Sequence, residues 1–145
     1  MKHRPSASAL LRVYLIPMVL GIVSGCSSGP TPGDPSWTLT PISDVRAVAG
    51  EWDGTMRNEQ SLLLPGTVRL MIRENGTYLF VGQDAVKSAV GSGFLDLRDG
   101  RLVGESDRRA VTLTLYDHKG TPILHADSIN HQTGDRYHGE FKKAE

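Results

Sequence analysis

The chain has 145 residues, 39% of them hydrophobic, and its 16 basic residues are matched by 16 acidic ones. This length and composition are typical of one globular domain and exclude a disordered or multidomain chain. Three of the 16 basic residues, Lys2, Arg4 and Arg12, precede Cys26, which leaves 13 basic residues against 16 acidic ones from there onward, a net charge of −3. A mildly acidic body offers no basic surface for nucleic acid, so nucleic acid is excluded as a partner.

A basic start and a short apolar run open the chain. Lys2 and Arg4 are followed by the apolar stretch 13–23, which contains Pro17. The run is shorter than the about 20 residues that a membrane-spanning helix needs, and a proline disfavours a long helix within it. The pattern therefore predicts a secretory signal rather than a membrane span.

The apolar run ends in Val23-Ser24-Gly25-Cys26, which resembles the lipobox of bacterial lipoproteins: an aliphatic residue, two small residues and a cysteine. The resemblance implies a signal peptide over 1–25, cleavage before Cys26, and acylation of that cysteine with chains such as palmitate. The alternative is an ordinary secretory signal with an incidental cysteine. Because Cys26 is the only cysteine, its acylation leaves no thiol for a disulfide or for redox chemistry.

The lipobox resemblance also implies a location and a first partner. Lipoproteins with aspartate directly after the cysteine typically stay in the inner membrane, whereas this chain has Ser27. We therefore expect a cell-envelope protein held by its lipid anchor in the outer membrane and facing the periplasm. The membrane is the partner that this anchor implies.

Residues 26–42 are rich in proline, glycine and hydroxyl side chains, which predicts an acylated cysteine followed by a flexible tether. Trp37 interrupts this polarity and is interpreted as a linker contact, either with the domain or with the lipid interface. The folded domain is predicted over 43–145. It is expected to begin with a short helical turn over 44–48, capped by Ser43 and ended by Gly50.

After residue 50 the hydrophobic pattern has a period of two, which predicts strands and no helix. A parallel sheet with crossover helices is thereby excluded. The expected strands, given by approximate ranges, are 51–57, 67–73, 77–83, 92–97, 101–106, 111–117, 123–128 and 136–142.

The connections carry turn residues. Asn75-Gly76 and Asp99-Gly100 fit two-residue type I′ hairpins, and Gly120 fits the end of a four-residue loop over 117–120. Residues 107–109 are predicted to be a charged loop, and the first connection, 58–66, is the long one. Because six of the seven connections suit hairpins, we expect an eight-stranded antiparallel meander. Closing it into a small barrel buries its apolar face and removes its edges.

The first strand opens with Gly50-Glu51-Trp52, and with the meander this resembles the lipocalin-like (calycin-type) barrels. The resemblance implies that Gly50 and Trp52 form the plug of the closed barrel end; the alternative is that Trp52 is an ordinary core residue. Lipocalins also stack a basic residue near the C-terminus on this tryptophan. Here Lys142 is interpreted as the last residue in reach of such a role.

The predicted interior is apolar, which argues against catalysis. The alternating pattern turns Val68, Leu70 and Ile72 inward, and no carboxylate pair or carboxylate–histidine pair accompanies them. We therefore expect no enzyme and no cofactor, with a hydrolase as the least favoured hypothesis. Four histidines are predicted to lie in turns or on outer faces without converging, so no metal site is expected: His118, His125, His131 and His138.

The long first loop contains Leu62, Leu63 and Leu64, which are interpreted either as a lid over the barrel mouth or as a core extension of the second strand. In the lid hypothesis the barrel binds a small apolar molecule in or at its mouth. The ligand-lining residues are then these leucines together with Tyr78, Phe80, Tyr116 and Tyr137. The alternative function is an envelope structural or interaction protein, an inhibitor or assembly accessory, that acts on a protein partner through its loops around a filled barrel.

Overall fold

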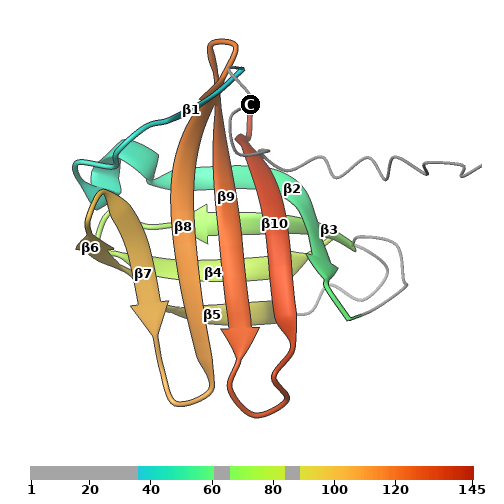
Figure 1. The fold of residues 1–145 in the computed structure, drawn as a ribbon. Coiled ribbons are helices and arrows are strands. Elements are labelled where there is room, and N and C mark those ends of the chain that lie inside the picture. The colour runs from blue at the N-terminus through green and yellow to red at the C-terminus, as the bar shows by residue number, and fades with distance from the viewer. Residues whose placement is uncertain (1–35, 61–65, 84–88) are drawn as a thin grey trace, which may run out of the picture.

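The computed structural model describes residues 36–60, 66–83 and 89–145, and about two thirds of these residues lie in strands (Figure 1). A single 3-10 turn, η1 (Val45–Val48), precedes the long strands of this described part. The strands are β1 (Trp37–Leu39), β2 (Gly50–Asn58), β3 (Gly66–Ile72), β4 (Thr77–Gly82), β5 (Ala89–Phe94), β6 (Asp96–Arg98), β7 (Arg101–Glu105), β8 (Arg109–His118), β9 (Thr121–Asn130) and β10 (Arg136–Lys143).

The strands form an antiparallel meander that nearly closes on itself. Their order is β5-β4-β3-β2-β10-β9-β8-β7-β6, so the first long strand, β2, pairs with the last, β10. Only Leu95 separates β5 from β6, and this one bent segment pairs with β4 on one side and with β7 on the other. The predicted all-β barrel is confirmed, with the fourth expected strand divided into β5 and β6.

The barrel wall consists of two groups of strands that cross each other. Figure 1 shows β8, β9 and β10 side by side in front, with β2 to β5 running across behind them. Apolar side chains fill the space between the groups. The largest side chains with no more than 1% exposure are Phe80, Phe141, Leu70, Leu102, Leu113, Leu124, Val48 and Val111.

The period-two pattern places the inner face correctly. Val68, Leu70 and Ile72 of β3 are all buried, while Arg69 and Met71 between them are half-buried on the outer face. Each residue of an antiparallel strand faces the same side as its partner, so the inner set continues around the barrel. The predicted assignment of these three residues to the core is therefore confirmed.

The hairpin predictions have mixed outcomes. Asp99 and Gly100 have φ values of 49° and 74°, which is the predicted type I′ turn. The β8–β9 connection was expected to be a four-residue loop, but Lys119 and Gly120, with φ of 54° and 83°, close it as a two-residue turn.

The prediction for Asn75-Gly76 is also wrong. Only Gly76 has a positive φ, 84°, and Gly76 N donates to Arg73 O at 2.9 Å, so the loop has three residues. Arg73 N in turn donates to Thr77 O at 2.8 Å, which closes the loop. A type I turn followed by a left-handed glycine has this form.

The segment before residue 43 corrects the predicted domain boundary. Trp37–Leu39 forms β1 and pairs with the end of β8 beyond the part that pairs with β7. Thr40 N donates to Leu115 O at 2.9 Å, and Ile42 is 3% exposed within the core. The folded domain thus includes residues 36–42, which were predicted to belong to the tether.

The 3-10 turn is capped by a different residue from the one expected. The Asp44 side chain accepts a hydrogen bond from Arg46 N at 3.0 Å, so Asp44 rather than Ser43 is the N-cap. An aspartate in this position satisfies a backbone donor that the turn leaves open.

Candidate functional site

Some of the predicted site residues lie outside the described residues. These are Cys26 and the loop leucines Leu62, Leu63 and Leu64. The residues that the structure describes fall into three regions: the plugged end of the barrel, its interior with the opposite end, and its outer face.

The plugged end is built around Trp52, which is 2% exposed. Its indole Nε1 donates to Val48 O at 2.8 Å, and this hydrogen bond holds η1 against the end of the barrel. Gly50 begins β2 with a φ of 119°, a conformation that side-chain-bearing residues rarely adopt. The predicted plug residues Gly50 and Trp52 therefore lie together at one end of the barrel.

A basic residue covers this tryptophan, and it is Lys143 rather than Lys142. Lys143 Nζ lies 4.8 Å from the centroid of the Trp52 ring and donates to Ala49 O. The alternation of side chains along β10 could have identified Lys143 from the sequence, because Phe141 and Lys143 face the same side of the strand. In the structure Lys143 pairs with Trp52 in the β10–β2 ladder. Lys142 points to the outer face instead.

The interior at the predicted ligand residues is filled with side chains. Phe80 is 1% exposed and Tyr78 is 7% exposed. The Phe80 ring lies 5.6 Å from Tyr78 and 5.7 Å from Phe141, centroid to centroid. A side chain with almost no accessible surface does not line a water-sized cavity, so Phe80 is a core residue.

Tyr116 was predicted to line the lumen, and this prediction is wrong. Tyr116 pairs with Leu39 and Ile123 on the outer face of the sheet, one residue out of step with the inward Leu115. Its ring makes edge contacts with Trp37 and His125, at centroid distances of 6.0 Å and 5.9 Å. A shift of one residue along a strand always exchanges the two faces.

The end of the barrel opposite the plug contains polar groups that sequence reasoning missed. Arg109 was predicted to lie in a charged loop, but it opens β8, and its guanidinium carbon is 5.9 Å from the centroid of the Tyr137 ring. A Cβ added at Gly91 would come within 2.2 Å of Arg109 Nη1, so the arginine crosses the interior and packs on β5. The predicted residue Tyr137 is half-buried and packs against the core.

The side chains of Ser128 and Tyr78 also face this end of the barrel. The Ser128 hydroxyl is buried with no hydrogen-bond partner among the described residues, and the residue is 7% exposed. Burial raises the pKa of Tyr78, and the positive charge of Arg109 opposes this rise. The tyrosine therefore stays protonated and can donate a hydrogen bond at any physiological pH.

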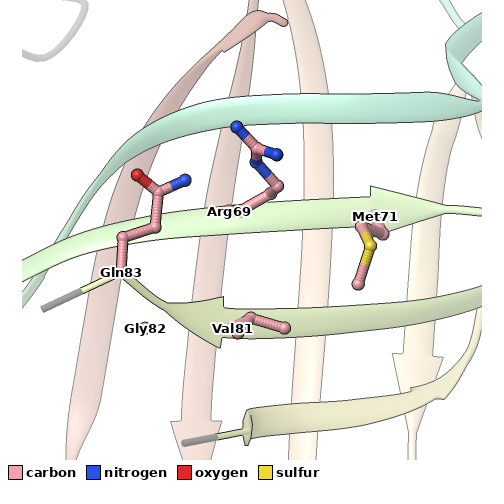
Figure 2. Close-up of a pocket in the computed structure, with 5 residues that line it drawn as sticks. All are labelled: Arg69, Met71, Val81, Gly82 and Gln83. Atoms are coloured by element: carbon pink, nitrogen blue, oxygen red, sulfur yellow. The ribbon is translucent and has the colours of Figure 1, made fainter. Parts of the chain in front are cut away.

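The outer face of β2 to β4 carries an ion-paired groove. Arg69 donates to Asp53 through Nε at 2.6 Å and through Nη2 at 2.9 Å, and Gln83 Nε2 donates to Asp53 at 2.8 Å. The hydrogen bond from Arg69 is the main cause that lowers the pKa of Asp53. Figure 2 shows Arg69 and Gln83 beside Met71 and Val81, which with Gly82 line a groove of about 400 Å³.

A second groove, of about 510 Å³, lies on the outer face of β8 to β10. His138 lies between two carboxylates beside it, with Nδ1 2.5 Å from Asp127 Oδ1 and Nε2 2.6 Å from Glu59 Oε1. Both ring nitrogens can donate to these oxygens only in the doubly protonated ring. The groove is lined by Ala110, Thr112, Asp127, Ser128, Ile129, Arg136 and His138.

The histidine in this groove lacks the geometry of a nucleophilic triad. In such a triad the nitrogen remote from the carboxylate holds the nucleophile's hydroxyl. In His138 that nitrogen, Nε2, faces a second carboxylate, Glu59. The outward-facing histidines predicted from alternation, His125 and His138, do point outward, and each contacts an acidic side chain.

Within residues 36–60, 66–83 and 89–145, no cluster of three His, Cys, Asp or Glu side chains is arranged to hold a metal ion. In the same part of the chain no helix is long and apolar enough to cross a membrane. No protein-family model, curated protein or solved structure matches this chain.

Proposed function

We propose that this chain is a non-enzymatic lipoprotein of the bacterial cell envelope, acylated at Cys26 and held in the outer membrane with its barrel in the periplasm. The support for the anchor is the short apolar run that ends in Val23-Ser24-Gly25-Cys26, with the only cysteine at the position where a lipobox has it. The plug of Gly50, Trp52 and Lys143 adds support for a lipocalin-like barrel behind that anchor.

For the barrel we propose a role as an interaction module that binds an envelope protein through its outer surface. The observation that carries this role is the filled interior: Phe80, Leu70 and Phe141 are 1%, 0% and 0% exposed. A barrel that carries a ligand in its lumen needs apolar side chains that border free space. Side chains without accessible surface leave the outer grooves and the loops as the places where a partner can bind.

The groove on β8 to β10 is the proposed contact region. It combines the exposed charges of Arg136 and Asp127 with the half-buried aliphatic side chain of Ile129. Protein interfaces are typically built in this way, from an apolar centre with a polar rim. Such a surface suits a protein partner with complementary charges.

The arrangement of His138 supports the non-enzymatic part of the proposal. A histidine that acts as a general base needs one nitrogen free to accept a proton from the reacting group. Both nitrogens of His138 face carboxylate oxygens instead. The cluster therefore suits a fixed polar contact on the surface.

A second candidate function is the binding of a small apolar molecule at the end of the barrel opposite the plug. The observation that favours it is the unpartnered Ser128 hydroxyl, buried at that end with Tyr137 and Arg109 nearby. Ligand sites commonly combine an apolar lining with a few such polar groups. The molecule would then lie at the mouth, because the centre of the barrel is occupied.

Photo-crosslinking in intact envelopes tests the interaction role. A photoreactive amino acid in place of Arg136, which lines the groove, is expected to give a discrete adduct with one envelope protein. Replacement of Arg98, an exposed residue of β6, is the matched control and is expected to give none. Equal labelling from both positions, or no adduct from either, would contradict the interaction role, and an extractable small molecule bound in a one-to-one ratio would favour the second candidate.

A further inference from the structure

The docked strand β1 shortens the connection between the barrel and the proposed anchor. If all sixteen residues 27–42 were extended, the seventeen steps from Cys26 to Ser43 would span about 56–61 Å at most. Because the described domain already begins at Ser36, only the nine residues 27–35 remain between it and Cys26, and the ten steps from Cys26 to Ser36 reach about 33–36 Å at most. The inference that follows rests on the proposed acylation of Cys26.

The position of β1 determines which end of the barrel the connection leaves. Trp37 stands opposite His118, next to the two-residue turn that joins β8 to β9. Figure 1 shows this hairpin and the C-terminus at the top of the view, and the β7–β8 and β9–β10 connections at the bottom. Lys143, which covers Trp52, lies two residues before this C-terminus. The plug and the start of the described chain therefore lie at the same end of the barrel.

β8 is about as long as the distance that residues 27–35 can span when fully extended. Its ten residues, Arg109–His118, extend about 33 Å at the usual rise of a strand. To turn the end at Arg109 toward the bilayer, the barrel would need those nine residues stretched to their limit, which costs conformational entropy. The end at His118 meets no such cost when it faces the lipid.

The surface near this end suits a lipid interface. Leu39 of β1 is 48% exposed, and Lys119 and Pro122 are exposed at the hairpin. Lys142 is exposed on the outer face of β10. Lysines attract anionic headgroups, and an aromatic residue such as Trp37 suits the headgroup region of a bilayer.

We propose that the end of the barrel formed by β1 and the β8–β9 hairpin rests on an anionic lipid bilayer. The loops over 106–108 and 131–135 then point away from the membrane. The strand that was expected to be part of a loose tether thus acts as the device that orients the domain. This orientation leaves the groove around His138, toward the lower end of β8 to β10, accessible to a periplasmic partner.

The anchor itself allows a clean test of this orientation. Once acylated, the only cysteine has no free thiol, so an introduced cysteine provides a single site for a fluorescent label. Thr121→Cys labels the hairpin end, and Gln132→Cys is the matched control at the opposite end, since both residues are exposed in turns or beside them. The full-length protein, extracted from membranes, is placed in phosphatidylethanolamine–phosphatidylglycerol vesicles that contain nitroxide-labelled lipid.

We expect the nitroxide lipid to quench the label at residue 121 several-fold more than the label at residue 132. Equal quenching, or stronger quenching at residue 132, in protein whose mass shows the acyl group would overturn the orientation while leaving the anchor intact. A mass that shows an unmodified Cys26 would overturn the anchor and the orientation together.

Discussion

Lys143 Nζ lies 4.8 Å from the centroid of the Trp52 ring, and the two residues stand opposite each other in the β10–β2 ladder. The same ammonium group donates to Ala49 O, and the Trp52 indole donates to Val48 O. The last strand, the first long strand and the 3-10 turn are thereby joined at one end of the barrel. Closure of the barrel and closure of its end depend on the same few residues.

Lys143→Met tests this junction. The substitution keeps much of the aliphatic chain but removes the ammonium group from the Trp52 face and from Ala49 O. We expect the free energy of unfolding to fall by about 1 kcal/mol, the usual size of a cation–π contact at a partly exposed site. Urea denaturation followed by tryptophan fluorescence measures it. Lys142→Met, one residue away on the outer face, is the control and should change stability by less than about 0.5 kcal/mol.

Gly54 is expected to tolerate no side chain. A Cβ at this position would lie 2.0 Å from the backbone oxygen of Glu140, on the neighbouring strand β10. Because a backbone atom of a paired strand cannot move aside cheaply, we expect Gly54→Ala to cost about 3 kcal/mol or to prevent folding. The denaturation midpoint, or the yield of folded protein, gives the result.

Gly91→Ala is the matched control for this substitution. Its added methyl group would meet Arg109 Nη1 at 2.2 Å, the end of a flexible side chain. The guanidinium can shift, so we expect a loss below about 1 kcal/mol. If both substitutions lowered the free energy of unfolding equally, the close approach of Gly54 to the backbone of β10 would not be the reason that position 54 requires glycine.

Phe80→Ala tests whether the barrel is filled. Removal of a side chain that is 1% exposed leaves a cavity, and we expect a loss of about 3–5 kcal/mol. An apolar cavity of this kind stays dry and binds small apolar probes such as benzene. We therefore expect benzene to raise the melting temperature of the variant but not that of the parent protein.

Leu79→Ala serves as the control, because Leu79 is adjacent in β4 but half-buried on the outer face. It should cost less than Phe80→Ala and should gain no response to benzene. If the parent protein itself responded to benzene as strongly as the variant, the interior would contain free space and the filled-barrel account would fail.

The pairing of Asp53 with Arg69 predicts a dependence of stability on acid. The pKa of Asp53 is lowered in the folded protein, mainly by the hydrogen bond from Arg69. A carboxyl whose pKa falls on folding stabilises the fold at neutral pH, and the contribution disappears as the pH falls below the ordinary value of about 3.9 and through the folded pKa. The effect should be small, because the Arg69 and Asp53 side chains are 40% and 41% exposed.

Asp53→Asn should accordingly lower the urea midpoint at pH 7 but not at a pH below the folded pKa of Asp53. Asp96→Asn, in an exposed pair with Arg98 at 3.6 Å, is the comparison and should change little at either pH. A constant difference between parent and Asp53→Asn at every pH would mean that the carboxylate charge is not responsible.

The barrel was predictable from the sequence where local rules decide the structure. Alternation in β3 places Val68, Leu70 and Ile72 inside, and Asp99-Gly100 makes the turn that its residue types favour. Tyr116 directly follows Leu115, whose side chain packs against the core, so the alternation of β8 places Tyr116 outside. The prediction that Tyr116 lines a cavity was wrong because it did not follow this alternation. Lys143 could have been found in the same way, by extending the inward set of β10 by one more step.

The pairing of β1 and the position of Arg109 could not be predicted from the local sequence. β1 lies in a stretch with the composition of a tether, and it forms a strand only because the end of β8 offers an edge that β7 does not cover. The role of Arg109 likewise depends on β5, which lies beside it only in the closed barrel. Such pairings between distant segments are decided by the tertiary structure rather than by propensity.

The central claim, a barrel that is lipid-anchored at Cys26 and filled by its own side chains, is tested most directly by native mass spectrometry of the protein extracted from membranes. The account predicts a chain that begins at residue 26, carries the added mass of acyl groups on that residue and holds no stoichiometric small molecule. An unmodified Cys26, or a tightly bound small molecule in a one-to-one ratio within the barrel, would contradict it.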